Sequence, residues 1–240
     1  RIWVGTEGGG LSRITEKRLY VNTITNNFNA PGHAFNTPVN AVLVEPSGTV
    51  WTGSVEGGLH RSDSNLSHFT HYTAEDGILS HNSVSALALD GEGNLWVGTW
   101  GGGVNILSTK GRVSRLRHFI TTTDGAWHIG YIGALIWDSL NKLMWVGTSR
   151  GLYIYNPVSD TMQEAYPGTF DDVFGAIGAV IDRYNHLWIG SSNGLIDIDL
   201  RRYAAKPDVN AVRHINGRFD NPGMTVNERI TFLFIDSRDR

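Results

Sequence analysis

One short motif recurs five times along the chain and limits the folds that are open to it. Each copy reads apolar residue, Trp, any residue, Gly, hydroxyl, and glycine and a branched apolar residue follow. Its tryptophans stand 43 to 49 residues apart, at Trp3, Trp51, Trp96, Trp145 and Trp188. A repeat of about 20 to 50 residues is typical of solenoids and propellers, in which each unit is one supersecondary structure.

The third unit illustrates the structure that we expect of each copy. Residues 85–89 are apolar on both faces, which favours an innermost strand packed between neighbouring sheets. A second strand at 95–99, a glycine hairpin at 101–103, a third strand at 104–107 and an outer, more polar strand at 113–120 follow. Four antiparallel strands per unit are the signature of a propeller blade. We therefore predict an all-β fold, a β-propeller built of four-stranded antiparallel blades.

The repeat also predicts the extent of the domain. Residues 1–240 contain five blade equivalents, because the chain opens on a second strand at 2–6 and stops after an inner strand at 230–235. Both ends are thus cut between strands one and two of a blade. Either the last inner strand pairs with residues 2–6 and closes a five-bladed ring, or the blades form an arc of a larger ring.

Composition excludes several other classes of protein. The chain has 240 residues, is 40% hydrophobic and 18% charged, and can bury a large core, which excludes intrinsic disorder. A net charge of -3 argues against nucleic-acid binding. No apolar run reaches the roughly 18 residues that span a bilayer, and the absence of cysteine excludes disulfides and thiolate metal sites. We expect no membrane segment, cofactor or metal in this region.

One stretch carries a family resemblance. It reads FTHY at 69–72, DGILSHNSV at 76–84 and GNLWVGTWGGGV at 93–104. These residues resemble the two-component regulator propeller repeat, and the other units resemble it mainly at the Trp-x-Gly-hydroxyl core. The repeat builds the periplasmic sensor half of hybrid two-component systems, which are common in gut Bacteroidetes.

The resemblance implies a context for the chain. Such sensors have rings of seven blades, usually two in tandem, so the five blades here would belong to a larger propeller ectodomain of an inner-membrane protein. It implies a non-catalytic periplasmic region that binds a glycan-derived oligosaccharide, forms a homodimer, and signals through C-terminal modules, including a histidine kinase, to polysaccharide-utilisation genes. Propellers host many functions, so two alternatives remain: an extracytoplasmic propeller enzyme (lyase or glycosidase) and a protein-interaction propeller.

Residues that recur in every unit are expected to serve the blade itself. The five tryptophans are predicted to fill space between blades. The hydroxyl of each motif, such as Thr99, is predicted to satisfy local backbone groups. A carboxylate ends each inner strand, where it can accept backbone N–H groups of the turn. These carboxylates are Glu45, Asp90, Asp138, Asp182 and Asp236.

Residues that occur in a single unit are free to serve a ligand. In an up-and-down blade, the turn between strands two and three lies at the same end as the link to the next blade, and we expect ligands to bind there. The turn candidates at this face are Glu7, Glu56, Trp100, Arg150 and Asn193. The link candidates are Trp127, His128 and Tyr131, with His33, Phe35, His81, Arg218 and Phe219 as weaker ones.

Aromatic and polar side chains at this face suit a sugar. An exposed indole or phenol can stack on the apolar face of a sugar ring while His and Arg bind its hydroxyls. Trp100 stands out because the other units have no aromatic residue there, whereas Trp127 and Tyr131 could equally pack under their own loop.

Catalytic patterns are weak in this sequence. We predict no catalytic residue, since neighbours such as Asp171 and Asp172 rarely converge on one substrate. His68 and His71 are not expected to share a metal ion, because their side chains point to opposite faces of a strand.

Overall fold

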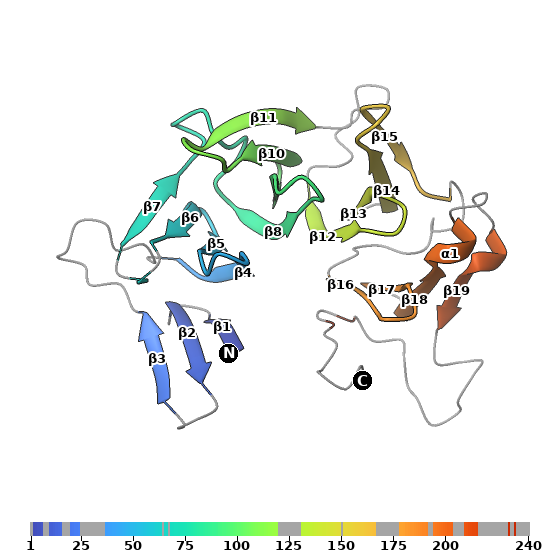
Figure 1. The fold of residues 1–240 in the computed structure, drawn as a ribbon, viewed down its shortest axis with the longest axis horizontal. Coiled ribbons are helices and arrows are strands. Elements are labelled where there is room, and N and C mark those ends of the chain that lie inside the picture. Colours follow the sequence, from blue (N-terminus) through green and yellow to red (C-terminus); the bar gives the residue numbers. More distant parts are fainter. Residues whose placement is uncertain are drawn as a thin grey trace. The chain divides into compact units, whose positions relative to one another are not determined.

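Five antiparallel sheets follow one another along the chain, and we name them blades 1 to 5 (Figure 1). The computed structural model describes residues 2–6, 10–15, 20–24, 37–63, 65–66, 68–119, 131–149, 151–166, 178–191, 194–203, 209–215, 230 and 233. In blades 2 to 5, four strands pair in chain order, and in blade 1 the described residues form three. The all-β propeller architecture predicted from the repeat is confirmed.

The blades have the following strands. Blade 1 contains β1 (Ile2–Thr6), β2 (Gly10–Thr15) and β3 (Tyr20–Ile24). Blade 2 contains β4 (Val39–Val44), β5 (Val50–Ser54), β6 (Gly58–Ser62) and β7 (Phe69–Tyr72). Blade 3 contains β8 (Val84–Leu89), β9 (Leu95–Thr99), β10 (Val104–Ser108) and β11 (Ser114–Phe119).

The remaining elements belong to blades 4 and 5. Blade 4 contains β12 (Ile132–Asp138), β13 (Leu143–Thr148), β14 (Gly151–Asn156) and β15 (Thr161–Glu164). Blade 5 contains β16 (Gly178–Ile181), β17 (His186–Ser191), β18 (Gly194–Asp199) and β19 (Val212–Ile215), with the helical turns α1 (Leu200–Tyr203) and η1 (Val209–Ala211) before β19.

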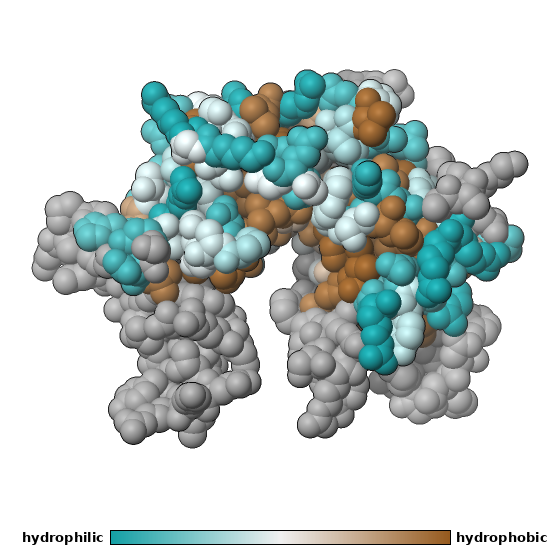
Figure 2. All heavy atoms as spheres, in the orientation of Figure 1, coloured by the Kyte–Doolittle hydropathy of each residue, from teal (hydrophilic) through white to brown (hydrophobic). Residues whose placement is uncertain are grey.

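The blades group into two compact units. Blades 1 to 3 lie in the first unit, and blades 4 and 5 lie in the second. In the first unit, hydrophilic side chains cover the outer strand β11, while the second strands of blades 2 and 3 are buried throughout (Figure 2). No helix in the described part of the chain is long and apolar enough to cross a membrane.

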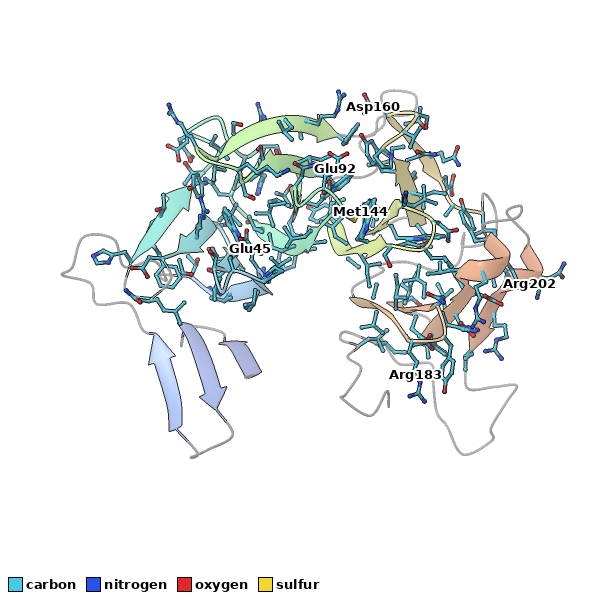
Figure 3. All side chains as sticks on the ribbon, viewed as in Figure 1. Glu45, Glu92, Met144, Asp160, Arg183 and Arg202 are labelled. Atoms are coloured by element: carbon cyan, nitrogen blue, oxygen red, sulfur yellow. The ribbon has the colours of Figure 1, made fainter. Side chains whose placement is uncertain are left out.

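The repeated tryptophans were predicted to fill space between blades, and the described ones are buried or half-buried. Trp51, Trp96 and Trp145 are at most 1% exposed, and Trp188 is half-buried. Asp90, Asp138 and Asp182 accept backbone N–H groups of the turn, as predicted, whereas Glu45 accepts the Ser47 hydroxyl and Asp236 lies outside the described residues. Glu45, Asp138 and Asp182 also accept an indole N–H. The indole of Trp51 donates to Glu45 after β4 (2.7 Å; Figure 3), and that of Trp188 donates to Asp182 (2.9 Å). Asp138 and Asp182 therefore each fix their turn and their tryptophan together.

The glycine of the motif allows neighbouring strands to approach closely. A Cβ on Gly53 would lie 2.3 Å from Cγ1 of Val84, the first residue of the next inner strand. A Cβ on Gly190 would likewise lie 2.6 Å from Cγ2 of Ile230. This glycine is therefore required by packing between a blade and the strand that follows it. Whether residues 230–235 pair with residues 2–6 or the blades form an arc of a larger ring stays open, because of residues 230–235 only Ile230 and Leu233 are described.

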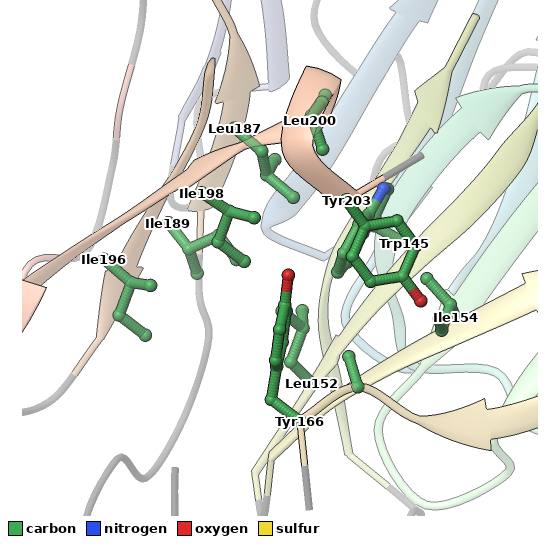
Figure 4. Close-up of a cluster of buried hydrophobic side chains, with 11 residues drawn as sticks. Trp145, Leu152, Ile154, Tyr166, Leu187, Ile189, Ile196, Ile198, Leu200 and Tyr203 are labelled. Carbon is green, nitrogen blue, oxygen red and sulfur yellow. The ribbon is translucent and has the colours of Figure 1, made fainter. Parts of the chain in front are cut away.

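The helical turn α1 was not predicted, since four residues are too few for a helical period. It occurs in blade 5 between β18 and β19 and packs against blade 4 (Figure 4). The ring of Tyr203 lies 5.0 Å from that of Trp145, and Leu200 is fully buried in the same cluster. The Asn141 side chain also donates to the Leu200 carbonyl (3.0 Å). These contacts join the two blades of the second unit.

The prediction that residues 85–89 are apolar and packed on both faces was partly wrong. Val84, Ala86 and Ala88 are buried, whereas Ser85, Leu87 and Leu89 are half-buried. The buried set begins at Val84 against Gly53, so it is the face toward blade 2 that is closely packed. This alternation is the usual pattern of an antiparallel strand.

Candidate functional site

The turn after each second strand lies beside the start of the inner strand of the same blade. The backbone N–H of Val55, Trp100 and Ser149 donates to the carbonyl of Pro38, Ser83 and Tyr131, respectively. The first residue after the motif is therefore fixed at the point where the chain enters the blade. This is the end at which we expected the ligand face.

Blade 2 presents Glu56 at this end. Its backbone is left-handed, with a φ of 57°, and its carboxylate side chain is exposed. The Glu56 N–H donates to the Ser83 hydroxyl (3.2 Å), and the Gly58 N–H donates to the Asn82 carbonyl (2.8 Å). The turn of blade 2 is thus bound to the link that enters blade 3.

Blade 3 presents Trp100, whose indole is 43% exposed. Its N–H donates to the Ser83 carbonyl (2.8 Å), and the glycine hairpin that follows is tightly held. Ser80 and His118 both donate to the Gly102 carbonyl, at 2.8 and 2.6 Å. A Cβ on Gly102 would lie 2.5 Å from the Ser80 hydroxyl, so only glycine fits there. A rigid hairpin therefore holds an exposed indole.

His81 completes this group of residues. The Ser83 N–H donates to His81 Nδ1 (3.0 Å), so Nδ1 carries no proton and the neutral ring carries its proton on Nε2. The ring is exposed and lies beside Gly101, where a Cβ would be 3.5 Å from Nε2. We call Glu56, His81, Ser83 and Trp100 the Ser83 cluster, since Ser83 binds all three of the others.

The link before Ser83 is well ordered by its own hydrogen bonds. Thr73 and Asp76 bind each other's N–H groups through their side chains, at 3.3 and 3.1 Å. The Asn82 side chain donates to both carboxylate oxygens of Glu75 and accepts from the Ala74 N–H. The bond from Asn82 lowers the pKa of Glu75. The link was predicted to be irregular, yet it gives the Ser83 cluster a defined base.

The Ser83 cluster supplies the groups that a polar ligand with apolar faces needs. An indole offers a stacking surface, the imidazole Nε2–H is a donor, and the carboxylate is an acceptor. Of these residues, Glu56 and Trp100 were main candidates and His81 was a weaker one. Ser83 was missed, because a serine that ends a link has no signal apart from its partners.

The other candidates divide between the second unit and the undescribed part of the chain. Tyr131 lies directly before β12 of blade 4 and is 59% exposed. The remaining candidates lie outside the described residues. They are Glu7, Trp127, His128, Arg150 and Asn193, with the weaker candidates His33, Phe35, Arg218 and Phe219.

Comparison with known families finds the same repeat. The family described as two component regulator propeller matches residues 78–101, which include His81, Ser83 and Trp100. No curated protein matches the chain.

Solved structures share the fold. The extracellular domain of the hybrid two component system BT3049 from B. thetaiotaomicron has 22% identity and a TM-score of 0.75 over 99% of this chain and 29% of its own. That of BT4673 from the same organism has 19% identity and a TM-score of 0.68 over 98% of this chain and 29% of its own. Virginiamycin B lyase from Staphylococcus aureus has 13% identity and a TM-score of 0.59 over 81% of this chain and 61% of its own. The chain spans less than a third of the length of the two extracellular domains.

Proposed function

We propose that this chain is part of a ligand-sensing propeller in the extracytoplasmic region of a hybrid two-component system, and that the Ser83 cluster binds its ligand. The observation that carries the proposal is the placement of Trp100, an exposed indole on a rigid hairpin inside the matched repeat. A blade does not need an aromatic residue there, since blade 2 has Val55 at the same position.

The ligand that we propose is an oligosaccharide derived from a glycan. The Trp100 indole stacks on one face of a sugar ring, while His81 Nε2–H and the Glu56 carboxylate bind hydroxyl groups. Because the cluster joins blades 2 and 3 through Ser83, a ligand that touches both Glu56 and Trp100 favours one arrangement of the two turns. A ligand shifts a conformational equilibrium only by its differential affinity for the two states.

Signal transfer needs the rest of the protein. We propose that the region is periplasmic, that it forms a homodimer, and that ligand binding is passed to a histidine kinase controlling polysaccharide-utilisation genes. The proposed role of this chain is binding without catalysis. The extracellular domains that it resembles are more than three times its length, so further blades can complete the site.

Calorimetry of the complete extracellular region against a panel of plant and host oligosaccharides tests this function, with product analysis of each mixture. The expected result is saturable binding of an oligosaccharide that is recovered intact. Cleavage of the bound sugar would instead support the propeller lyase or glycosidase. A panel without any binding sugar would contradict the proposed ligand class.

Trp100→Ala tests the site itself. A stacking contact is worth about 1 kcal/mol, so the affinity should fall about fivefold or more. Leu116→Ala is the matched control, because Leu116 is an exposed apolar residue on the outer strand of the same blade (53% exposed). Equal affinities of the two variants would place the ligand elsewhere.

A further inference from the structure

Two histidines face each other across the outer hairpin of blade 2. His60 on β6 and His71 on β7 are directly paired in the sheet, and their Nδ1 atoms are 3.2 Å apart. Their rings are nearly perpendicular, with centroids 4.6 Å apart. His60 is 1% exposed, whereas His71 is exposed. One histidine of the pair is therefore deep in the blade and the other is at the surface.

The hydrogen bonds around His60 determine where its proton lies. The Ser54 hydroxyl donates to the Gly58 carbonyl (3.3 Å), just as the motif hydroxyls of blades 3 to 5 donate to their hairpin carbonyls. It must then accept from His60 Nε2, at 3.0 Å. His60 consequently carries its proton on Nε2, and the lone pair on its Nδ1 points at His71.

His71 opens onto a pocket of the same unit. The pocket has a volume of about 460 Å³ and lies between the outer strand of blade 2, the link after it and the turn before β11. His71, Tyr72, Asp76 and Arg112 are among its lining residues. Water or a small ligand can therefore reach the His71 end of the pair.

We propose that His60 Nδ1 and His71 Nδ1 bind a divalent transition-metal ion such as Zn²⁺, with solvent from the pocket completing its coordination. Two nitrogens that each lie about 2.0–2.1 Å from a tetrahedral Zn²⁺ are about 3.3 Å apart, close to the 3.2 Å observed. The ion takes the place of the proton that the two nitrogens otherwise share, and His71 moves its own proton to Nε2.

The contact between His60 and Ser54 suits a metal ligand. A ligating histidine usually donates its other ring N–H to a fixed acceptor, and Ser54 is that acceptor for His60.

The equivalent pairs of other blades do not repeat this arrangement. The same cross-strand positions hold Asn105 and His118 in blade 3, and Tyr153 and Glu164 in blade 4. His118 is committed to the Gly102 carbonyl. By the reasoning that separates repeated from unique residues, a His pair in one blade is not needed by the fold.

Calorimetric titration of the full chain with ZnCl₂ at pH 7.5 tests the proposal. We expect saturable binding of about one equivalent, and His71→Asn should weaken it by more than roughly tenfold, since loss of even an outer partner of a ligand costs about that much. His68→Asn is the matched control, because His68 is an exposed histidine on the same hairpin that pairs with Asp63 (3.5 Å). The control should bind Zn²⁺ like the wild type.

Thermal melts with and without Zn²⁺ give a second readout. Zn²⁺ should raise the Tm of the wild type and of His68→Asn, but not that of His71→Asn. Because His71 is exposed, its variant is expected to fold, whereas His60→Asn changes the core. Absence of Zn²⁺ binding to the wild type, or unchanged affinity in His71→Asn, would overturn the proposal and leave the pair as a hydrogen bond only.

Discussion

Blades 2 and 3 share the Trp-x-Gly-hydroxyl motif but differ at the position after it and in the outer hairpin. In both, a buried tryptophan precedes a buried glycine and a hydroxyl that donates to the hairpin glycine carbonyl. At the next position, blade 2 has Val55 and blade 3 has the exposed Trp100. In the outer hairpin of blade 2, His71 contacts His60 through their Nδ1 atoms. In blade 3, the equivalent His118 donates to the Gly102 carbonyl instead.

This comparison separates two kinds of position within one repeat. Positions that are alike in both blades make contacts inside the blade or against its neighbour. Apart from the buried His60, which Asn105 replaces in blade 3, positions that differ carry side chains that reach solvent or a pocket. A variant at a shared position should therefore change stability, and one at a differing position should change binding.

Trp96 and Trp100 give the largest contrast, since they lie four residues apart in one blade. Trp96→Ala should reduce the free energy of unfolding by about 3–5 kcal/mol, because Trp96 is only 1% exposed and its removal leaves a cavity. Trp100→Ala should change it by less than about 0.5 kcal/mol. Urea unfolding of both variants measures this. A loss of several kcal/mol in Trp100→Ala would make Trp100 a core residue and end its role in the proposed site.

The His60 pair predicts a pH dependence that blade 3 lacks. Burial, and to a lesser extent His71, lowers the pKa of His60 from 6.5 to about 3 in the folded chain. Between these two pH values the unfolded chain takes up a proton at this ring that the folded chain does not. The free energy of unfolding is therefore highest above pH 6.5 and decreases as the pH falls toward 3, by up to several kcal/mol.

His60→Asn, which introduces the residue found at this position in blade 3, tests the pH dependence. Urea unfolding from pH 7 to 4 should show a smaller loss of stability in the variant than in the wild type. Other groups, such as Asp182, titrate in both proteins and cancel in the difference. Parallel pH profiles for the two proteins would show that His60 is not held neutral by burial.

The sequence predicted the shared positions well and the differing ones only in part. Spacing alone identified the blades, the buried tryptophans and the carboxylates after the inner strands, because each depends on contacts close in sequence. The His60 and His71 pair was missed, since its contact depends on the register of a hairpin with ten residues between them. His71 was instead considered with His68, its neighbour along the strand.

The candidate site followed the same rule. Trp100 and Glu56 could be predicted from their positions after the motif. Their connection through Ser83 could not, because it requires the link before blade 3 to fold in one particular way. The glycine of the motif was recognised as part of the repeat, but its reason, the approach of Val84, became clear only from packing.

Gly53→Ala should have an intermediate effect. The added Cβ would lie 2.3 Å from Val84 Cγ1, and such overpacking costs about 1–3 kcal/mol. The double variant Gly53→Ala, Val84→Ala removes the clashing methyl group. Its loss in free energy of unfolding should therefore be smaller than the sum of the losses of the two single variants. Additive losses in urea unfolding would show that Gly53 is not needed for this approach.

Ser83→Ala should have a smaller effect on stability than Gly53→Ala and a larger one on binding. It removes one hydrogen bond, from the Glu56 N–H, and leaves the bond from Trp100 N–H to the Ser83 carbonyl intact. The free energy of unfolding should fall by about 1 kcal/mol.

Because Glu56 loses its attachment to blade 3, an oligosaccharide that contacts both turns should bind the complete extracellular region more weakly. Ser85→Ala is the control, since Ser85 is a half-buried serine of the same inner strand region, two residues further along the chain. If Ser83→Ala and Ser85→Ala bind the sugar equally well, the two turns bind it independently of each other. Trp100 alone then accounts for the difference in ligand binding between blades 2 and 3.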